Sequence, residues 1–524
     1  MGADLIRGPL LALALAAGGP ALAEAPHGTP PGAPLSAIDW LSESISPAAG
    51  PPLLDEPPAT GGIATEDIAV SVLGASRADA AGLFSPAVTG LPRGLWGASS
   101  RDDLIRIITT ARPEPLPALR ELFRTLLLAE LDPPADSDAT GRMLLARIDK
   151  LLEMAAIEEA AALIEVAGST VAGAEMFRRA FDVALLTGTE DDTCAEMRRS
   201  PGLAPTFPAR IYCLARGGDW QAAALTLRTA QALGYVSGEE EELLARFLDP
   251  ELYDGDNPLP PPHRPTPLIW RMYEAVGEPL GTHGLPLAFA HAELRPTSGW
   301  KAQLEAAERL ARVGAIPSNR LLGLYTERRP AASGGVWDRA AALQAFDAAL
   351  AAGDAGAAAS ALPPVWARMQ EAELEVPFAE LYAEPLAALD LPEAARALAF
   401  HIALLAPGYE RAALDHAPRD AGARFLAALA TGRTEGAAPP DSMARAIAPV
   451  FTGTPGATTG PALAAMLAED RMGEAILTAI DRITEGTTGD RRGVTEGLAL
   501  LRHIGLEDAA RRTALQLLLL DRRG

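Results

Sequence analysis

Residues 207–234 read FPARIYCLARGGDWQAAALTLRTAQALG and contain two helical patterns on either side of a Gly-Gly-Asp-Trp turn. In each pattern, apolar residues recur three and four positions apart, which is the spacing that places them on one face of an α-helix. Gly and Asp interrupt the pattern at the point where the chain has to reverse its direction. The stretch therefore predicts a helical hairpin.

The same kind of pattern continues from Arg101 onward. Further runs with helical spacing are LIRIITTA (104–111), LPALRELFRTLLLAEL (116–131), GRMLLARIDKLLEM (141–154) and EEAAALIEVAG (158–168). A later run, SGWKAQLEAAERLARVGAI (298–316), is expected to form a helix with Ser298 as its N-cap and with Trp300, Leu304, Ala307 and Leu310 on one face. These runs predict an all-α protein, an α-solenoid of stacked helical hairpins, with a disordered and partly extended N-terminal arm.

Composition divides the helical part of the chain into regions. We expect helical-repeat regions at residues 100–250 and 267–435, and a C-terminal helical region at 462–524. The polyproline-containing stretch 251–266 is expected to be a stiff spacer, and the Pro- and Gly-rich stretch 436–461 a linker. Both breaks are expected to act as hinges.

Part of the hairpin stretch resembles the second half of a tetratricopeptide repeat. In GGDWQAAALTLRTA, Gly218, Asp219 and Trp220 stand at the turn, and Ala223, Leu227 and Ala230 on the inward face of the second helix. Two partial matches are DLPEAARALAFHIALLAP (390–407), through Ala395, Ala399 and Pro407, and GLEDAARRTALQL (505–517), through Gly505, Ala510 and Ala514. The first helix departs from the family pattern, because Ile211 stands where a small residue is usual. The resemblance implies degenerate tetratricopeptide-like repeats with a concave surface for a protein or peptide, while stacked hairpins without a groove are the alternative.

The whole chain also resembles a group of exported, Ala-rich bacterial proteins. The shared text is AIDWL (37–41) and AVTGLPRGLWG (87–97). That group carries the label antifreeze glycopeptide polyprotein, and its function is unknown. The Ala-Ala-Thr tripeptide of true antifreeze glycopeptides does not occur in this sequence, so the resemblance gives no reason to expect ice binding.

The first residues have the layout of a secretory signal peptide. Arg7 is followed by the apolar run from Pro9 to Ala17 and then by Ala21-Leu22-Ala23, which has small residues where signal peptidase requires them. We expect residues 1–23 to be a signal peptide that is cleaved after Ala23, and the mature protein to be periplasmic. The apolar run is too short for a membrane anchor, and we expect no later segment to span a bilayer.

Residues 24–62 are expected to be a Pro-, Ala- and Gly-rich disordered linker with a short docking segment at 35–45. Within that segment, the apolar residues include Ile38, Trp40, Leu41 and Ile45, and most of them fall at helical spacing. A helix this short needs a partner to be stable. The segment is expected either to dock onto its own helical body or to fold into a groove on another envelope protein, unless its apolar residues are only part of a linker.

Residues 63–99 are expected to form an extended arm with one short strand. The strand is predicted from IAVSVLG, in which Ile68, Val70 and Val72 alternate with Ala69 and Ser71. The apolar pairs Leu83-Phe84 and Leu95-Trp96 follow and are expected to anchor the arm to the surface of the helical body.

The chain has two cysteines, Cys194 and Cys213. In an exported protein an even number of cysteines favours pairing. The two lie in neighbouring predicted helices, and adjacent antiparallel helices can bring such positions within bridging distance. A disulfide between them is the first interpretation, and two buried free thiols are the second.

The sequence offers little support for catalysis or for metal binding. Ser298 and Lys301 fit the Ser-x-x-Lys motif of penicillin-binding proteins, but its Lys-Thr-Gly and Ser-Asp-Asn partner motifs are absent from the sequence. His283 and His291 are eight residues apart with a Pro between them, which is poor spacing for a metal site. We therefore expect no enzyme, no cofactor and no metal. The net charge of −23 also argues against nucleic acid as a partner.

These observations favour a non-catalytic periplasmic protein that binds or scaffolds another envelope protein or peptide. It would act through its helical-repeat surface and its N-terminal arm. The alternative is a cell-wall enzyme with a helical superhelix that resembles the soluble lytic transglycosylases. That alternative requires a catalytic Glu in a lysozyme-like domain, which the text after Ala462 does not suggest.

Overall fold

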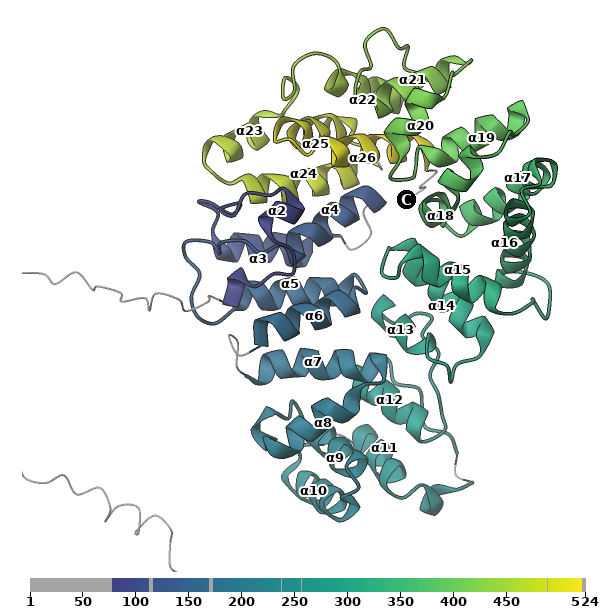
Figure 1. Cartoon of the computed structure of the whole chain (residues 1–524). Coiled ribbons are helices and arrows are strands. Elements are labelled where there is room, and N and C mark those ends of the chain that lie inside the picture. The colour runs from purple at the N-terminus through teal and green to yellow at the C-terminus, as the bar shows by residue number, and fades with distance from the viewer. Residues whose placement is uncertain are drawn as a thin grey trace, which may run out of the picture. The chain divides into compact units, whose positions relative to one another are not determined.

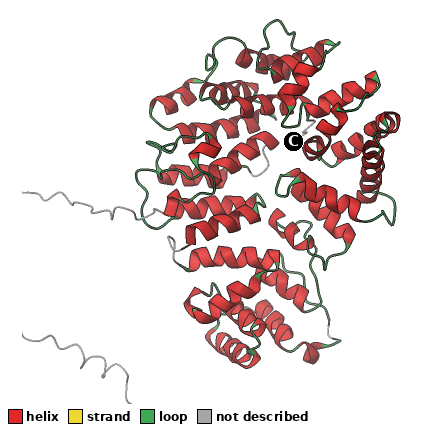
Figure 2. Ribbon diagram, viewed as in Figure 1, coloured by secondary structure: helices red, strands yellow, loops and turns green. Residues whose placement is uncertain are grey.

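The computed structural model describes residues 78–112, 116–168, 173–236, 238–255, 257–487 and 489–520. Within these residues there are 25 α-helices and no strand, so the predicted all-α class is confirmed (Figure 2). Every element below belongs to one unit, Val72–Gly524. No helix in the described ranges combines the length and the apolar character needed to cross a bilayer. The predicted signal peptide, linker and strand lie outside the described residues.

Residues 78–99 form short turns rather than a continuous extended arm. They contain η1 (Ala78–Ala80) and α2 (Pro86–Thr89). Leu95 and Trp96, two of the expected anchors, are buried. The Leu95 carbonyl accepts a hydrogen bond of 2.9 Å from Gly473 N. This segment therefore belongs to the core, unlike the surface arm that we expected. Phe84, another expected anchor, is 39% exposed.

The first helices pack as successive layers, and Figure 1 shows them side by side. Each of α5, α6 and α7 contacts its neighbour in this series, and α3 and α4 both pack on α5. Their bounds are α3 (Arg101–Thr110), α4 (Pro117–Leu128), α5 (Arg142–Glu153), α6 (Ile157–Ala167) and α7 (Ala174–Thr187). Because the apolar residues of each helix recur at helical spacing, each one buries a face against the next.

The next group contains the predicted hairpin, which is formed by α9 and α10. The group consists of α8 (Glu190–Arg199), η3 (Pro201–Leu203), α9 (Phe207–Arg216), α10 (Trp220–Leu233), α11 (Gly238–Leu248), η4 (Pro250–Tyr253) and α12 (Pro267–Ala275). In the turn, Gly218 has a φ of +84°, which glycine adopts without a steric cost. The Asp219 side chain then caps α10 by accepting a hydrogen bond of 3.0 Å from Ala222 N. The buried residues of α10 are Ala223, Leu227 and Ala230, as the sequence predicted.

The middle of the chain continues the all-helical pattern. Its elements are η5 (Leu287–Phe289), α13 (Ala290–Glu293), α14 (Trp300–Arg312), α15 (Ser318–Glu327), α16 (Val336–Ala351), α17 (Ala355–Glu371), α18 (Glu375–Ala387), α19 (Glu393–Ala403), α20 (Tyr409–Asp415) and α21 (Ala421–Ala430). Trp300, Leu304, Ala307 and Leu310 of α14 are buried on one face, as predicted. The N-cap of α14 is Gly299 rather than Ser298.

The two Pro-rich breaks differ from the spacer and the linker that we expected, because both contain buried residues. In the first break, Leu259 is buried and its N–H donates a hydrogen bond of 2.7 Å to Glu278 Oε2. The Tyr273 hydroxyl of α12 also donates to Pro260 O at 2.6 Å. The second break contains α22 (Ser442–Ile447) and η6 (Ala448–Phe451), in which Ala444, Ile447, Val450 and Phe451 are buried. The apolar residues in these stretches therefore pack against helices in spite of the surrounding Pro and Gly.

The last helices pack against the first ones. They are α23 (Pro461–Ala468), α24 (Met472–Gly486), α25 (Arg491–His503) and α26 (Glu507–Leu519). Helix α24 contacts α3, and α26 contacts α4. The buried Gln516 of α26 accepts a hydrogen bond of 2.8 Å from Ala118 N in the first turn of α4. One large core therefore includes residues of the first and the last helices, while a second core lies around α8 to α12.

Candidate functional site

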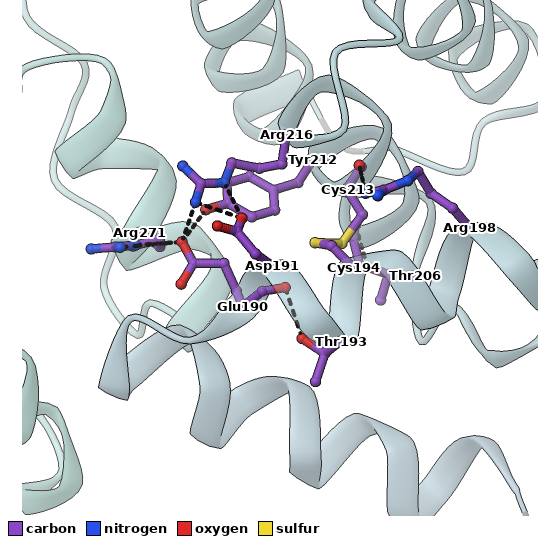
Figure 3. The surroundings of a disulfide bond; sticks show 11 residues. Glu190, Asp191, Thr193, Cys194, Arg198, Thr206, Tyr212, Cys213, Arg216 and Arg271 are labelled. Atoms are coloured by element: carbon purple, nitrogen blue, oxygen red, sulfur yellow. Dashed lines mark hydrogen bonds and ion pairs between the residues drawn. A yellow bond between two sulfur atoms is a disulfide. The ribbon is translucent and has the colours of Figure 1, made fainter.

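The predicted disulfide is present and lies inside the second core. Cys194 on α8 and Cys213 on α9 are bonded, with their Cα atoms 4.9 Å apart, and both are buried (Figure 3). The bond ties α8 to the first helix of the α9–α10 hairpin. The predicted docking residues Ile38, Trp40, Leu41 and Ile45 lie outside the described residues.

A charged network that the sequence did not predict lies close to the disulfide. Glu190, at the start of α8, is fully buried, and its Oε1 atom accepts hydrogen bonds from the Tyr212 hydroxyl at 3.0 Å and from Arg271 Nη2 at 3.1 Å (Figure 3). Arg216 Nη2 lies 3.6 Å from the same oxygen. Burial raises the pKa of the Tyr212 phenol, and the Glu190 charge raises it further. The network therefore joins α8 and α9 to α12.

Several of the exposed large apolar side chains come from this part of the chain. Among the described residues, nine large apolar side chains are exposed, and five of the nine lie between residues 220 and 252. We call these five the hairpin surface: Trp220, Leu225, Leu233, Tyr235 and Leu252. Exposed apolar side chains that occur together mark interaction sites more often than isolated ones do. The hairpin surface is therefore the candidate functional site.

The two aromatic residues of the hairpin surface are held in place by other rings. Trp220, which is 50% exposed, packs against Phe247 of α11 with ring centroids 6.2 Å apart. Tyr235, which is 59% exposed, stacks on Phe207 of α9 with centroids 4.8 Å apart. Each residue thus packs against a second ring and keeps at least half of its surface in solvent. A binding partner would gain contact area from both rings at little cost in side-chain entropy.

The local sequence explains why these residues point outward. Ala223, Leu227 and Ala230 face α9, and Leu225 falls on the opposite side of α10. The two alanines of the inward face allow α10 to lie close to α9, and Leu225, on the other side of α10, stays in solvent. The sequence contained this signal for Leu225, because helical spacing places it opposite Ala223, Leu227 and Ala230. No comparable pattern in the sequence predicted that Leu252 in η4 would be exposed.

Three of the candidate catalytic or metal-binding residues, Ser298, Lys301 and His291, have contacts within the protein. His291 is buried on α13, and its Nε2 atom lies 2.8 Å from Ala155 O. Burial lowers the pKa of His291 to about 4. Lys301 Nζ lies 3.5 Å from Glu305 Oε1 on α14, and Ser298 N donates to Arg295 O at 3.0 Å in the turn before that helix.

The hairpin surface thus combines exposed apolar side chains, fixed aromatic rings and a disulfide-bonded support. Comparison of the chain with protein-family models, with curated proteins and with solved structures gives no match.

Proposed function

We propose that this protein is a non-catalytic periplasmic protein that binds or scaffolds another envelope protein or peptide. The observation that carries the proposal is the hairpin surface, which holds five of the nine exposed large apolar side chains of the described residues. A partner that covers these side chains removes them from water, and each fully covered side chain is worth about 1.5–3 kcal/mol. Binding therefore needs only a partner with a complementary apolar surface.

The proposal includes a tetratricopeptide-like α-solenoid as the architecture that presents this surface. Support comes from the α9–α10 hairpin, where the Gly218-Asp219 turn and the inward alanines match the resemblance. The other two partial matches also place their alanines in the core, since Ala395 and Ala399 on α19 and Ala510 and Ala514 on α26 are buried. Repeats of this kind bind proteins through surfaces that their neighbouring helices hold in place.

The disulfide and the Glu190 network support the same function. Both fix α9, on which Phe207 stacks with Tyr235 and against which α10 packs. A surface that is already ordered before binding loses less conformational entropy when a partner docks. A disulfide in this position also fits an exported protein, because such bonds persist in oxidising compartments.

A site-specific photocrosslink tests this proposal. A photoreactive amino acid replaces Leu225 on the hairpin surface in one variant and the equally exposed Leu414 on α20 in a control variant. We expect discrete crosslinked products from Leu225 in intact envelopes that are absent from Leu414. Identical product patterns from both positions would count against the proposal.

The N-terminal segment 35–45 is the second element of the proposal. If it docks on a partner, the Trp40→Ala variant keeps the melting temperature of the mature protein and loses partner capture. If it instead docks onto its own helical body, the variant melts at a lower temperature. A muramidase assay on the mature protein tests the alternative of a cell-wall enzyme, and clear activity would replace the binding proposal.

A further inference from the structure

A cavity of about 300 Å³ lies where the first and the last helices of the protein meet. Residues of α3, α4, α23 and α24 line it, together with Ala111 and Arg112 just after α3. Helix α24 contacts each of the other three helices (Figure 1). We call this space the closure cavity. It is separate from the hairpin surface, whose residues do not line it.

Part of the wall of the closure cavity is apolar. The apolar side chains that line it are Ile107, Ala111, Phe123, Met466, Leu477 and Ile480. The volume lies at the lower end of the range of small-molecule sites, which is about 300–1,000 Å³. Such sites combine an apolar wall with a few polar groups that decide which ligand is bound. The polar groups of the closure cavity therefore indicate the chemical class of its ligand.

The three threonine hydroxyls of the lining offer acceptors rather than donors. Each donates its proton to the backbone carbonyl four residues earlier: Thr110 to Arg106 O at 2.8 Å, Thr478 to Glu474 O at 2.8 Å and Thr484 to Ile480 O at 2.7 Å. A hydroxyl has one O–H donor and two acceptor lone pairs, so its lone pairs are what remains for a ligand. The threonines therefore favour a ligand that donates hydrogen bonds.

The charged groups of the lining favour a cation. Their ion pairs are Arg106 Nη2 with Asp103 Oδ1 at 2.9 Å, Arg112 Nη2 with Glu485 Oε1 at 3.1 Å and Glu474 Oε2 with Arg471 Nε at 2.9 Å. Asp481, the fourth charged group of the lining, makes no hydrogen bond or ion pair with any residue that the structure describes.

Counting the ion-pair partners does not remove this excess of negative charge. The charged lining and its direct partners comprise three arginines (Arg106, Arg112, Arg471) and four carboxylates (Asp103, Glu474, Asp481, Glu485). Arg471 also pairs with Glu469, which adds a fifth carboxylate. A carboxylate ligand would have to displace one of these partners, whereas a cation finds the carboxylate of Asp481 unpaired.

The acceptors follow one another along α24. Thr478, Asp481 and Thr484 are three residues apart, so they lie on neighbouring turns, and each step is about 4.5 Å along the helix axis. A primary ammonium group has one positive charge and three N–H donors, and it accepts no hydrogen bond. We propose that the closure cavity binds a primary ammonium group on an apolar chain, carried by a small amine or by a lysine side chain. Asp481 and the threonine hydroxyls of α24 accept its hydrogen bonds, and the apolar wall contacts its chain. This site goes beyond the proposed function and does not depend on the hairpin surface.

Ligand-observed NMR titration of the full mature protein at a pH of about 7 tests the site. Pentylamine supplies the ammonium group, 1-pentanol is its neutral counterpart, and pentanoate reverses the charge. Trimethylpentylammonium keeps the positive charge but has no N–H donor. We expect pentylamine to bind with a Kd of about 1 mM, at least about tenfold more tightly than pentanol or pentanoate and at least about threefold more tightly than the trimethyl compound.

A fifth probe, N-acetyl-lysine-N-methylamide, identifies the source of the ammonium group. It carries the lysine side chain between two peptide bonds. Tighter binding of this probe than of pentylamine identifies a lysine side chain as the ligand, and equal or weaker binding identifies a small amine.

Variants of the cavity test which groups hold the ligand. Asp481 is exposed and has no partner among the described residues, so Asp481→Asn is expected to fold normally and to weaken pentylamine binding at least about tenfold. Thr478→Val removes one acceptor at nearly constant shape and is expected to weaken binding about threefold. Glu384→Gln on α18 is the matched control, because it removes the same charge from an exposed helical position outside the cavity. It is expected to bind normally.

Five results would overturn the site. They are equal binding of pentylamine and pentanol, equal binding of pentylamine and the trimethyl compound, tighter binding of pentanoate, normal binding by folded Asp481→Asn, and no binding of any probe at about 10 mM. The photocrosslink from Leu225 does not involve this cavity, so its outcome leaves the ammonium site unaffected, and failure of the site leaves the proposed function standing.

Discussion

The ring of Tyr235, just after α10, stacks on the ring of Phe207 at the start of α9, with centroids 4.8 Å apart and ring planes within 6° of parallel. The two residues are at opposite ends of the hairpin sequence, so the stack closes the hairpin at its open end. Tyr235 nevertheless keeps 59% of its surface in solvent. The same ring thus orders the hairpin and offers a contact surface to a partner.

The stack makes a small contribution to stability that can be measured. We expect Tyr235→Ala to lower the free energy of unfolding by about 1 kcal/mol, because aromatic pairs are worth about 0.5–1.5 kcal/mol beyond their buried area and this ring is half exposed. Leu225→Ala, which removes an exposed side chain without a ring partner, is the matched control and is expected to change stability by less than about 0.5 kcal/mol. Urea unfolding of the two variants measures the difference. A loss above about 3 kcal/mol for Tyr235→Ala would show that the ring belongs to the core.

The disulfide is expected to stabilise the second core. Cys194 and Cys213 are 19 residues apart, and closing a loop of about this length contributes roughly 3 kcal/mol through the unfolded state. Replacing both by Ser should lower the free energy of unfolding by that amount and leave the rest of the helical body folded. Alkylation of the non-reduced native protein should label neither thiol, and labelling after denaturation without a reductant would rule out the bond.

His291 is expected to make the protein less stable in mild acid. Its pKa is about 4 in the folded protein because burial disfavours the charged form, while an unfolded histidine titrates near 6.5. As the pH falls below about 6.5, the unfolded state takes up a proton that the folded state does not, so stability decreases until the pH reaches about 4. At a pH of about 5 the expected loss is roughly 2 kcal/mol.

The His291→Gln variant isolates this effect. Glutamine cannot take up the proton, so the difference in unfolding free energy between the variant and the wild type should shift by roughly 2 kcal/mol in favour of the variant between a pH of about 7 and about 5. His263→Gln, at an exposed position, is the control and should show no such shift. If the two proteins lose stability in parallel, the buried histidine does not cause the acid response.

The contact between the first and last helices is expected to depend on Gln516. Its side-chain carbonyl accepts from Ala118 N at 2.8 Å, and Gln516→Ala leaves that buried N–H without this partner. We expect a loss of about 1–3 kcal/mol and earlier proteolysis near the C-terminal helices. Gln370→Ala, at an exposed position on α17, should behave as the wild type. Equal stability of the two variants would show that α26 is held without this bond.

Local pattern in the sequence was enough to predict the helices and the hairpin. The Gly218-Asp219 turn and the inward positions Ala223, Leu227 and Ala230 are set by residues within a few positions of one another. The disulfide followed from two cysteines on adjacent helices. In each case the interaction that determines the structure is short-range, so a single stretch of sequence contains it.

The packed state of residues 436–461 could not be predicted in the same way. In the second break, Ile447, Val450 and Phe451 are buried. The Pro- and Gly-rich sequence around them gave no pattern from which this burial could be predicted. Such contacts depend on which helices meet across the fold, and that information is not in any local pattern.

The central claim is that the hairpin surface binds another envelope protein, and quantitative capture from envelope extracts tests it most directly. The mature wild type, the Trp220→Ala/Tyr235→Ala double variant and the Leu414→Ala control are used as baits at equal concentration, after their melting temperatures have been compared. The account predicts that proteins captured by the wild type and by the control are depleted at least about tenfold on the double variant. Equal capture by all three folded baits would contradict it.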